Sequence, residues 1–217
     1  MEMHMTRLHK PHWIAGICAL LLGLPSLPAQ ADDDLPYPPV APRGSALIRL
    51  YNASGQETGA TVGPVSLSEV APFASGDYEH LQPGRYGVRV GSQTLPVVLE
   101  ADRQYTLVNQ SGTAQLVEEP PFRSRQKALL RLQNLSDRPL ALKTADGRTE
   151  VVSSVAPHGR GEREINPVKV GLALFDGERK VADLKPVVLD RGETLCLYVT
   201  GSPSSLTPVW VRRPARE

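Results

Sequence analysis

Short segments of this chain alternate apolar and polar side chains with a period of two. Residues 46–51 (ALIRLY) and 85–90 (RYGVRV) place apolar side chains at every second position. This period is typical of a β-strand with one buried face. No ten-residue stretch combines helical spacing with capping residues, and twenty prolines count against long helices. The pattern predicts an all-β protein.

The same segments occur twice, in the same order. The matching ranges are 45–55 (SALIRLYNASG) with 127–137 (KALLRLQNLSD), 68–72 with 153–157, 81–90 with 165–174, 95–100 with 185–190, and 105–108 with 195–198. The second copy has six extra residues around Asp176-Gly177, and a turn between strands tolerates such an insertion. Matching segments in a fixed order indicate a duplicated unit.

We therefore predict two tandem, internally duplicated antiparallel β-sandwich domains, immunoglobulin-like or jelly-roll-like, joined by a short proline-containing linker. Gly84, Asp146-Gly147 and Asp176-Gly177 are expected to supply positive-φ residues at turns. The predicted boundaries are a signal peptide at 1–31, an extended proline-rich arm at 32–44, the first sandwich at 45–118, the linker at 119–126 and the second sandwich at 127–217.

The N-terminal residues of the chain predict that the protein is exported. Arg7 and Lys10 precede an apolar run at 14–24 that is too short to span a bilayer. Ala29-Gln30-Ala31 then matches the small-x-small pattern of a signal-peptidase site. We expect a periplasmic protein from which this segment has been cleaved.

Cleavage would leave Cys196 as the single cysteine. Because it alternates with leucines in "TLCLYVTG", a packed and inert thiol is expected rather than a reactive one. Asn52 and Asn134 fit the glycosylation triplet, but they occupy equivalent repeat positions. We expect each to cap a strand end or to begin a turn.

Charge divides unevenly between the copies. Residues 32–118 hold five basic and ten acidic side chains, and residues 119–217 hold seventeen and twelve. Overall balance argues against a nucleic-acid partner. The second copy is the better candidate for an anionic partner, although a merely solvated charge pattern would look the same.

Catalytic and metal-binding patterns are missing. The two histidines after the leader, His80 and His158, lie outside any nucleophile motif. They and Cys196 do not make a metal-ligand set, and an acidic run at 32–34 is more often solvated than calcium-bound. We predict a protein that is not an enzyme and that uses no cofactor and no metal.

Sugar binding by exposed aromatic side chains is the alternative that the composition leaves open. Tyr51 and Tyr198 fall on the polar phase of their strands and are candidates for exposure, and Trp210 is the one tryptophan after the leader. A platform for a long sugar chain normally gathers several aromatic rings, which makes this signal weak.

These residues resemble the AlgF family of periplasmic alginate O-acetylation proteins. The resemblance covers nearly the whole mature chain, including "APRGSALIRLYNASG", "EEPPFRSRQKALLRLQNLS", "LKTADGRTEVV" and "PVWVRRP". The loop "APHGRGER", which contains His158, is the main departure. The resemblance implies a non-catalytic accessory or adaptor protein that is required for O-acetylation of the exopolysaccharide alginate.

The partners implied by the resemblance are periplasmic SGNH-type acetyltransferases and a membrane O-acyltransferase. The alternatives are a binding module for the anionic polymannuronate chain and, less favoured, an acetyl carrier that uses a serine or Cys196. The candidate contact residues for a partner or for the polymer are Arg123, Arg125, Lys127, Arg212, Arg213 and Trp210.

Overall fold

The computed structural model describes residues 42–111, 113–202 and 205–213, which form strands and turns but no helix. The predicted signal peptide (1–31), the acidic run at 32–34 and all but the last residues of the predicted arm lie outside the described residues. The described residues belong to one compact unit that begins at Ala41. Within them, no helix that could cross a membrane is found.

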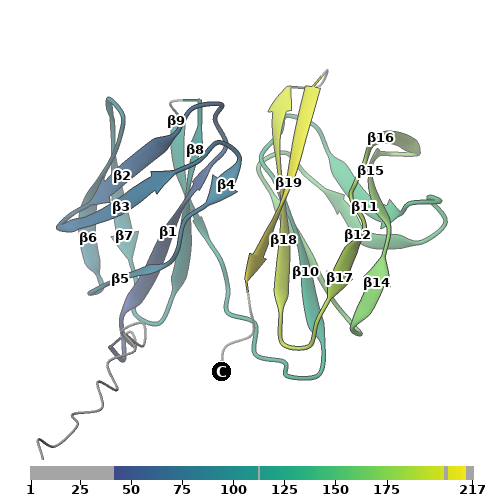
Figure 1. Cartoon of the computed structure of the whole chain (residues 1–217), viewed down its shortest axis with the longest axis horizontal. Coiled ribbons are helices and arrows are strands. Elements are labelled where there is room, and N and C mark those ends of the chain that lie inside the picture. The colour runs from purple at the N-terminus through teal and green to yellow at the C-terminus, as the bar shows by residue number, and fades with distance from the viewer. Residues whose placement is uncertain (1–41, 112, 203–204, 214–217) are drawn as a thin grey trace, which may run out of the picture. The chain divides into compact units, whose positions relative to one another are not determined.

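The first half of the described chain forms two facing sheets (Figure 1). Its strands are β1 (Ala46–Asn52), β2 (Thr58–Val62), β3 (Val65–Val70), β4 (Ala74–Ser75), β5 (Glu79–Leu81), β6 (Gly84–Val90), β7 (Gln93–Leu99), β8 (Gln104–Gln110) and β9 (Thr113–Glu118). One sheet has the order β4-β1-β8-β9, with β5 also paired to β1, and the other has the order β3-β2-β6-β7.

The second half repeats this plan. Its strands are β10 (Ala128–Asn134), β11 (Leu140–Thr144), β12 (Glu150–Val155), β13 (Arg160–Ile165), β14 (Val168–Val170), β15 (Leu172–Asp176), β16 (Arg179–Asp183), β17 (Val187–Leu189), β18 (Thr194–Ser202) and β19 (Ser205–Arg213). The sheets have the orders β13-β10-β18-β19 and β12-β11-β15-β16, and β14 pairs with β17. The long β6–β7 hairpin of the first half therefore corresponds to two shorter ladders in the second half, β15–β16 and β14–β17.

The predicted all-β, duplicated sandwich is confirmed, with one difference in strand direction. β1 runs parallel to β8, and β10 runs parallel to β18, in matching registers such as Leu50 with Leu107 and Leu132 with Leu197. All the other pairs among the described strands are antiparallel. In each half the chain crosses to the opposite sheet between the two parallel strands, and a long connection of this kind allows parallel pairing.

Each half has its own apolar core between its sheets. Ile48, Leu50 and Leu107 are fully buried in the first half, as are Leu132 and Leu174 in the second. These residues lie on the apolar phase of the alternation. Period-two patterning therefore places the inner face of each sandwich correctly.

Two buried asparagines close equivalent turns, as predicted. Asn52 Nδ2 donates to the carbonyl oxygens of Gln56 at 2.6 Å and Val70 at 2.8 Å. Asn134 Nδ2 donates to the equivalent carbonyls of Arg138 at 2.7 Å and Val155 at 3.0 Å. Both side chains are fully buried, which explains the repeated N-x-S triplet as turn chemistry.

The expectations for positive-φ glycines are partly met. Gly147 and Gly177 have φ of 73° and 61° and lie in turns. The prediction for Gly84 is wrong, because this residue begins β6 and is absent from the positive-φ residues. Phe73 and His158, which follow the matching "VAP" segments, share φ values of 56° and 58°. The duplication therefore extends to the backbone conformation of non-glycine turn residues.

The sheets that contain β1 and β10 are buried on both faces. Tyr51, Val108 and Ala53 of the first half form one apolar cluster with Leu135, Cys196, Tyr198 and Val211 of the second. The rings of Tyr51 and Tyr198 stack with centroids 4.4 Å apart, and both residues have 0% exposure. The expectation that these tyrosines are exposed is therefore wrong. Alternation distinguishes the two faces of a strand, but it does not reveal that a second sandwich covers the outer face.

Candidate functional site

A buried cluster of charged and phenolic groups, here called the Glu119 clasp, joins the two halves. It consists of Arg49, Tyr78, Glu119, Tyr198 and Arg213. Arg49 Nη2 lies 3.2 Å from each carboxylate oxygen of Glu119. The Tyr78 hydroxyl donates to Glu119 Oε2 at 2.5 Å, and the Tyr198 hydroxyl donates to Oε1. Arg213 Nη1 lies 3.6 Å from Oε2.

Residues from both halves hold this carboxylate. Arg49 projects from the outer face of β1, and Tyr78 lies between β4 and β5. Tyr198 and Arg213 come from β18 and β19 of the second half. The Arg49 guanidinium also packs over the Tyr78 ring, 4.6 Å from its centroid. Glu119, only 2% exposed, follows β9 directly and is therefore fixed by both halves at the point where the chain leaves the first.

The clasp keeps its charges at neutral pH. Burial by itself would raise the pKa of Glu119, but Arg49 and the hydrogen bonds from Tyr198 and Tyr78 lower that pKa to about 2. Burial and the nearby Glu119 carboxylate raise the pKa of Tyr78 to about 12. A general acid or base works best with a pKa near the working pH. These groups are instead held far from it, so the arrangement joins structural elements.

The residues next to Glu119 are also anchored. Arg131, the repeat equivalent of Arg49, donates from Nη2 to the Pro120 carbonyl at 3.1 Å and from Nε to Glu162 at 2.9 Å. Arg160 Nη1 donates to the Glu118 carbonyl at 2.8 Å. The predicted linker at 119–126 therefore begins with a segment bound to the second half. Its exact boundaries remain a prediction.

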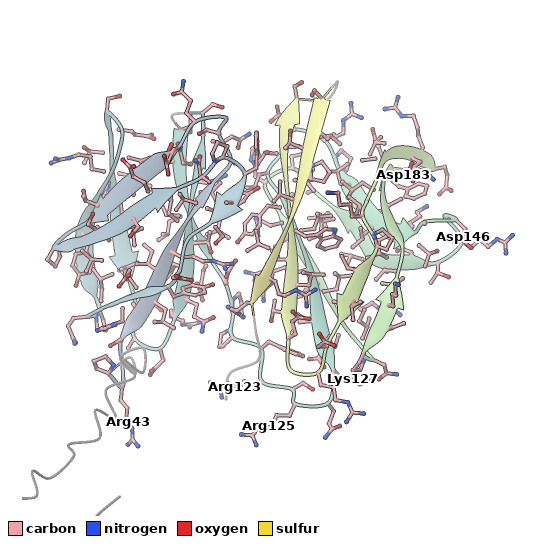
Figure 2. All side chains as sticks on the ribbon, viewed as in Figure 1. Arg43, Arg123, Arg125, Lys127, Asp146 and Asp183 are labelled. Carbon is pink, nitrogen blue, oxygen red and sulfur yellow. The ribbon has the colours of Figure 1, made fainter. Side chains whose placement is uncertain are left out.

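Three of the predicted contact residues lie at the start of the second half. Arg123 and Arg125 are exposed and point away from the strands (Figure 2). Neither forms an ion pair with a residue that the structure describes. Lys127 is half-buried, and its Nζ donates to Asn166 Oδ1 at 2.8 Å. Arg123 and Arg125 are thus free to meet a partner, whereas Lys127 already has one within the chain.

The other three predicted residues lie on β19. Arg213 belongs to the clasp and also donates to Gln104 Oε1. Trp210 packs against the core of the second half with its Nε1 buried. Arg212 is exposed, pairs with Glu193 and donates from Nη2 to the Val188 carbonyl at 3.0 Å. Of these three, Arg212 is exposed, whereas Trp210 and Arg213 are half-buried.

The chemically reactive side chains do not gather. The predicted packing of Cys196 is confirmed, because it is 3% exposed and burial raises the pKa of its thiol to about 12. His158 is exposed and lies 3.4 Å from Asp137, whereas His80 lies on β5 in the first half. In the described ranges, no group of three or more His, Cys, Asp or Glu side chains is arranged to hold a metal ion.

An exposed valine opposite a basic residue occurs at the same place in both halves. Val98 on β7 pairs with Arg85 on β6, and Val188 on β17 pairs with Lys169 on β14. The two valines are 56% and 45% exposed, and both cations are exposed. Burial in the core explains why a core valine is kept in both copies. It does not explain why an exposed valine is kept in both. We name these two features the valine–cation pairs.

Signals for these sites are weak in the sequence. Arg49 and Arg131 match in the repeat and lie on the polar phase of apolar strands, which could have indicated a second buried face. Glu119 lies in the predicted linker, and nothing in "EEPP" distinguishes it from the exposed Glu118. The valine–cation pairs are visible in the aligned copies, but only the structure establishes their exposure.

The fold and the clasp define a tandem β-sandwich protein whose duplicated halves are joined through a buried ion-pair network. The chain belongs to the AlgF family: the family model described as "Alginate O-acetyl transferase AlgF" matches residues 19–196.

Named relatives agree with this assignment. The chain is 62% identical to "Alginate biosynthesis protein AlgF" of Azotobacter vinelandii, over 98% of this chain and 100% of the relative. It is 57% identical to the protein of the same name from Pseudomonas aeruginosa, over 98% of each chain.

Solved structures include the separate domains of AlgF from P. aeruginosa. The C-terminal domain is 68% identical and covers 41% of this chain and 99% of that chain, with a TM-score of 0.38. The N-terminal domain is 48% identical and covers 37% of this chain and 100% of that chain, with a TM-score of 0.34.

Proposed function

We propose that this protein is a non-catalytic periplasmic adaptor for the O-acetylation of alginate. It would hold periplasmic SGNH-type acetyltransferases near the membrane O-acyltransferase that supplies acetyl groups. The observation that carries the proposal is the recurrence of an exposed valine–cation pair on two halves that the Glu119 clasp joins. Two fixed surfaces raise the effective concentration of their partners without any chemistry of their own.

The family description contains the word transferase, so an enzymatic role is the alternative that the experiments must test. Group transfer needs an activated nucleophile beside a base. The described thiol is buried and has a raised pKa, and His158 is paired with Asp137 on an exposed turn. These placements favour the adaptor. The periplasmic location rests on the signal-peptide pattern of residues 1–31.

Binding of the mature chain to a purified SGNH-type acetyltransferase, measured by biolayer interferometry, tests the adaptor role. We expect saturable binding at micromolar concentrations. The proposal would be rejected if the mature chain bound neither that enzyme nor the membrane O-acyltransferase in detergent. Incubation of the mature chain with an acetyl donor and oligomannuronate, followed by mass spectrometry, should show neither an acetylated protein nor an acetylated sugar.

Direct binding of polymannuronate is the second candidate. The observation in its favour is that Arg123 and Arg125 are exposed and free of ion pairs with the described residues. This function requires affinity that falls steeply with salt. Calorimetry with oligomannuronate at low ionic strength separates the two functions, because the adaptor role expects no heat of binding.

A further inference from the structure

The outer face of the β6–β7 hairpin carries a hollow and two arginines that form no ion pair with the described residues. The exposed side of this ladder pairs Arg85 with Val98, Gly87 with Pro96, and Arg89 with Thr94. A hollow of about 390 Å³ is lined by Arg85, Tyr86, Gly87, Thr94, Pro96, Val97 and Val98. A Cβ placed on Gly87 would meet no atom within 4 Å. The hollow thus lies over a glycine and a proline. Arg85 lines it, and Arg89 lies opposite the lining residue Thr94.

The charge of this face is opposite to that of its half. Neither β6 nor β7 contains an acidic residue, although residues 32–118 carry twice as many acidic as basic side chains. Arg85 and Arg89 form no ion pair with any residue that the structure describes. Two exposed, uncompensated guanidinium groups favour an anionic occupant.

The spacing of the arginines fits an extended chain. Arg85 and Arg89 are four positions apart on β6, a distance of about 13 Å along the strand. An extended peptide with carboxylates four residues apart matches that distance. Its middle side chain then lies over Gly87 and Pro96, beside the exposed Val98.

The composition of the face favours a peptide over a polysaccharide. Sugar rings are commonly bound by stacking on exposed aromatic side chains. Here the exposed apolar groups are Val98 and Pro96. Tyr86 is the one aromatic residue that lines the hollow, and it is half-buried, with its ring against Gly63 and its hydroxyl donating to the Gln82 carbonyl. Pro96 also lacks an N–H group on an edge strand, which disfavours strand addition to β7 and leaves the face as the route of contact.

We propose that the β6–β7 face docks an extended acidic segment of a protein partner, with acidic side chains on Arg85 and Arg89 and an apolar side chain over Gly87. This inference rests on the proposed adaptor function and specifies one of its contacts. The pair Lys169–Val188 beside Arg212 is the corresponding feature of the second half, where the ladder is shorter and offers a single strand cation.

A designed peptide provides the probe. It has seven residues, with glutamates at its second and sixth positions, a valine at its fourth, and serine or threonine elsewhere. Amide chemical-shift changes of the full mature chain report where it binds. We expect shifts confined to β6 and β7, and a dissociation constant at least ten-fold higher for a peptide with glutamine in place of both glutamates.

Two variants test the site in different ways. The double variant Arg85→Ser, Arg89→Ser removes both cations, and Gly87→Gln fills the hollow without a predicted clash at Cβ. Each should weaken peptide binding at least ten-fold, whereas Arg191→Ser, an exposed arginine of the second half, should leave binding unchanged. Unchanged amide spectra away from the substitutions show that the variants are folded.

Three results of the peptide experiment would overturn the inference. The first is the absence of shifts on this face with millimolar peptide. The second is that oligomannuronate, and not the peptide, shifts these amides. The third is concentration-dependent shifts without peptide, which would assign the face to a second copy of the chain. If the acetyltransferase still binds both variants normally, the adaptor function stands and only this docking face is rejected.

Discussion

The two halves of the molecule share their turns and cores but differ where they meet. Asn52 and Asn134 make the same hydrogen bonds at equivalent turns. At the contact between the halves, Tyr51 is the counterpart of Gln133, and Val108 is the counterpart of Tyr198. At these turns the two copies kept the residues that fold each sandwich, and at these two joint positions they diverged. Divergence at Tyr51 and Tyr198 therefore reports the joint, although Arg49 and Arg131 at the joint are shared by both copies.

Removing the clasp carboxylate should have the largest effect on stability. Glu119→Ala leaves Arg49 buried without its carboxylate, and breaking a buried ion pair from one side costs about 3–5 kcal/mol. Urea unfolding of the mature chain measures this loss. The neighbouring Glu118→Ala is the matched control, because Glu118 is exposed and its pairing with Arg103 is worth at most about 1 kcal/mol. Equal losses for both variants would contradict the role of the clasp.

Acid should weaken the contact between the two halves, because it protonates the Glu119 carboxylate. The pKa of Glu119 falls from an ordinary value of 4.5 to about 2 on folding. Its ionisation therefore stabilises the folded state fully above about pH 5, and about 3 kcal/mol is lost as the pH falls through the folded pKa. Unfolding free energies measured between about pH 6 and pH 2 should fall more steeply for the wild type than for Glu119→Gln. Parallel curves for these two proteins would contradict the lowered pKa.

The shared turns predict equal effects in the two halves. Asn52→Ala and Asn134→Ala each remove a buried donor from several carbonyl groups. Each substitution should lower the free energy of unfolding by roughly 2 kcal/mol, because carbonyls left unpaired in the interior cost about 1–3 kcal/mol. Denaturant unfolding checks both, with the exposed Asn166→Ala as the control. A large loss in one half only would show that the two turns are not equivalent.

The stacked tyrosines should respond differently to loss of their hydroxyl groups. The Tyr198 hydroxyl donates to Glu119, so Tyr198→Phe should cost about 1.5 kcal/mol. The Tyr51 hydroxyl is buried without a hydrogen-bond partner among the described residues, so Tyr51→Phe should be neutral within about 0.5 kcal/mol. Both variants keep the stacked rings, which makes each the control for the other. If Tyr51→Phe lowered the free energy of unfolding more than Tyr198→Phe, these roles of the two hydroxyl groups would be wrong.

The alternation of residues and the repeat were sufficient to predict the sandwiches, because inward side chains such as Ile48 and Leu130 obey a period of two. The turn role of Asn52 and Asn134 followed from their equivalent places. The same reasoning failed for Tyr51 and Tyr198, because a strand's outer face looks alike whether water or another sandwich covers it. Glu119 could not be found from its neighbours, since its partners come from strands far apart in the sequence.

The position of Glu119 also has a mechanical consequence. A pull on one half would load the groups around this carboxylate together with the other contacts between the halves before it extends the peptide backbone that follows. If partners attached to opposite halves move, the first elements to yield would be hydrogen bonds from Tyr78 and Tyr198 and the ion pairs of Arg49 and Arg213. Tension would then extend residues 120–127 and increase the distance between the partners, while both sandwiches stay folded.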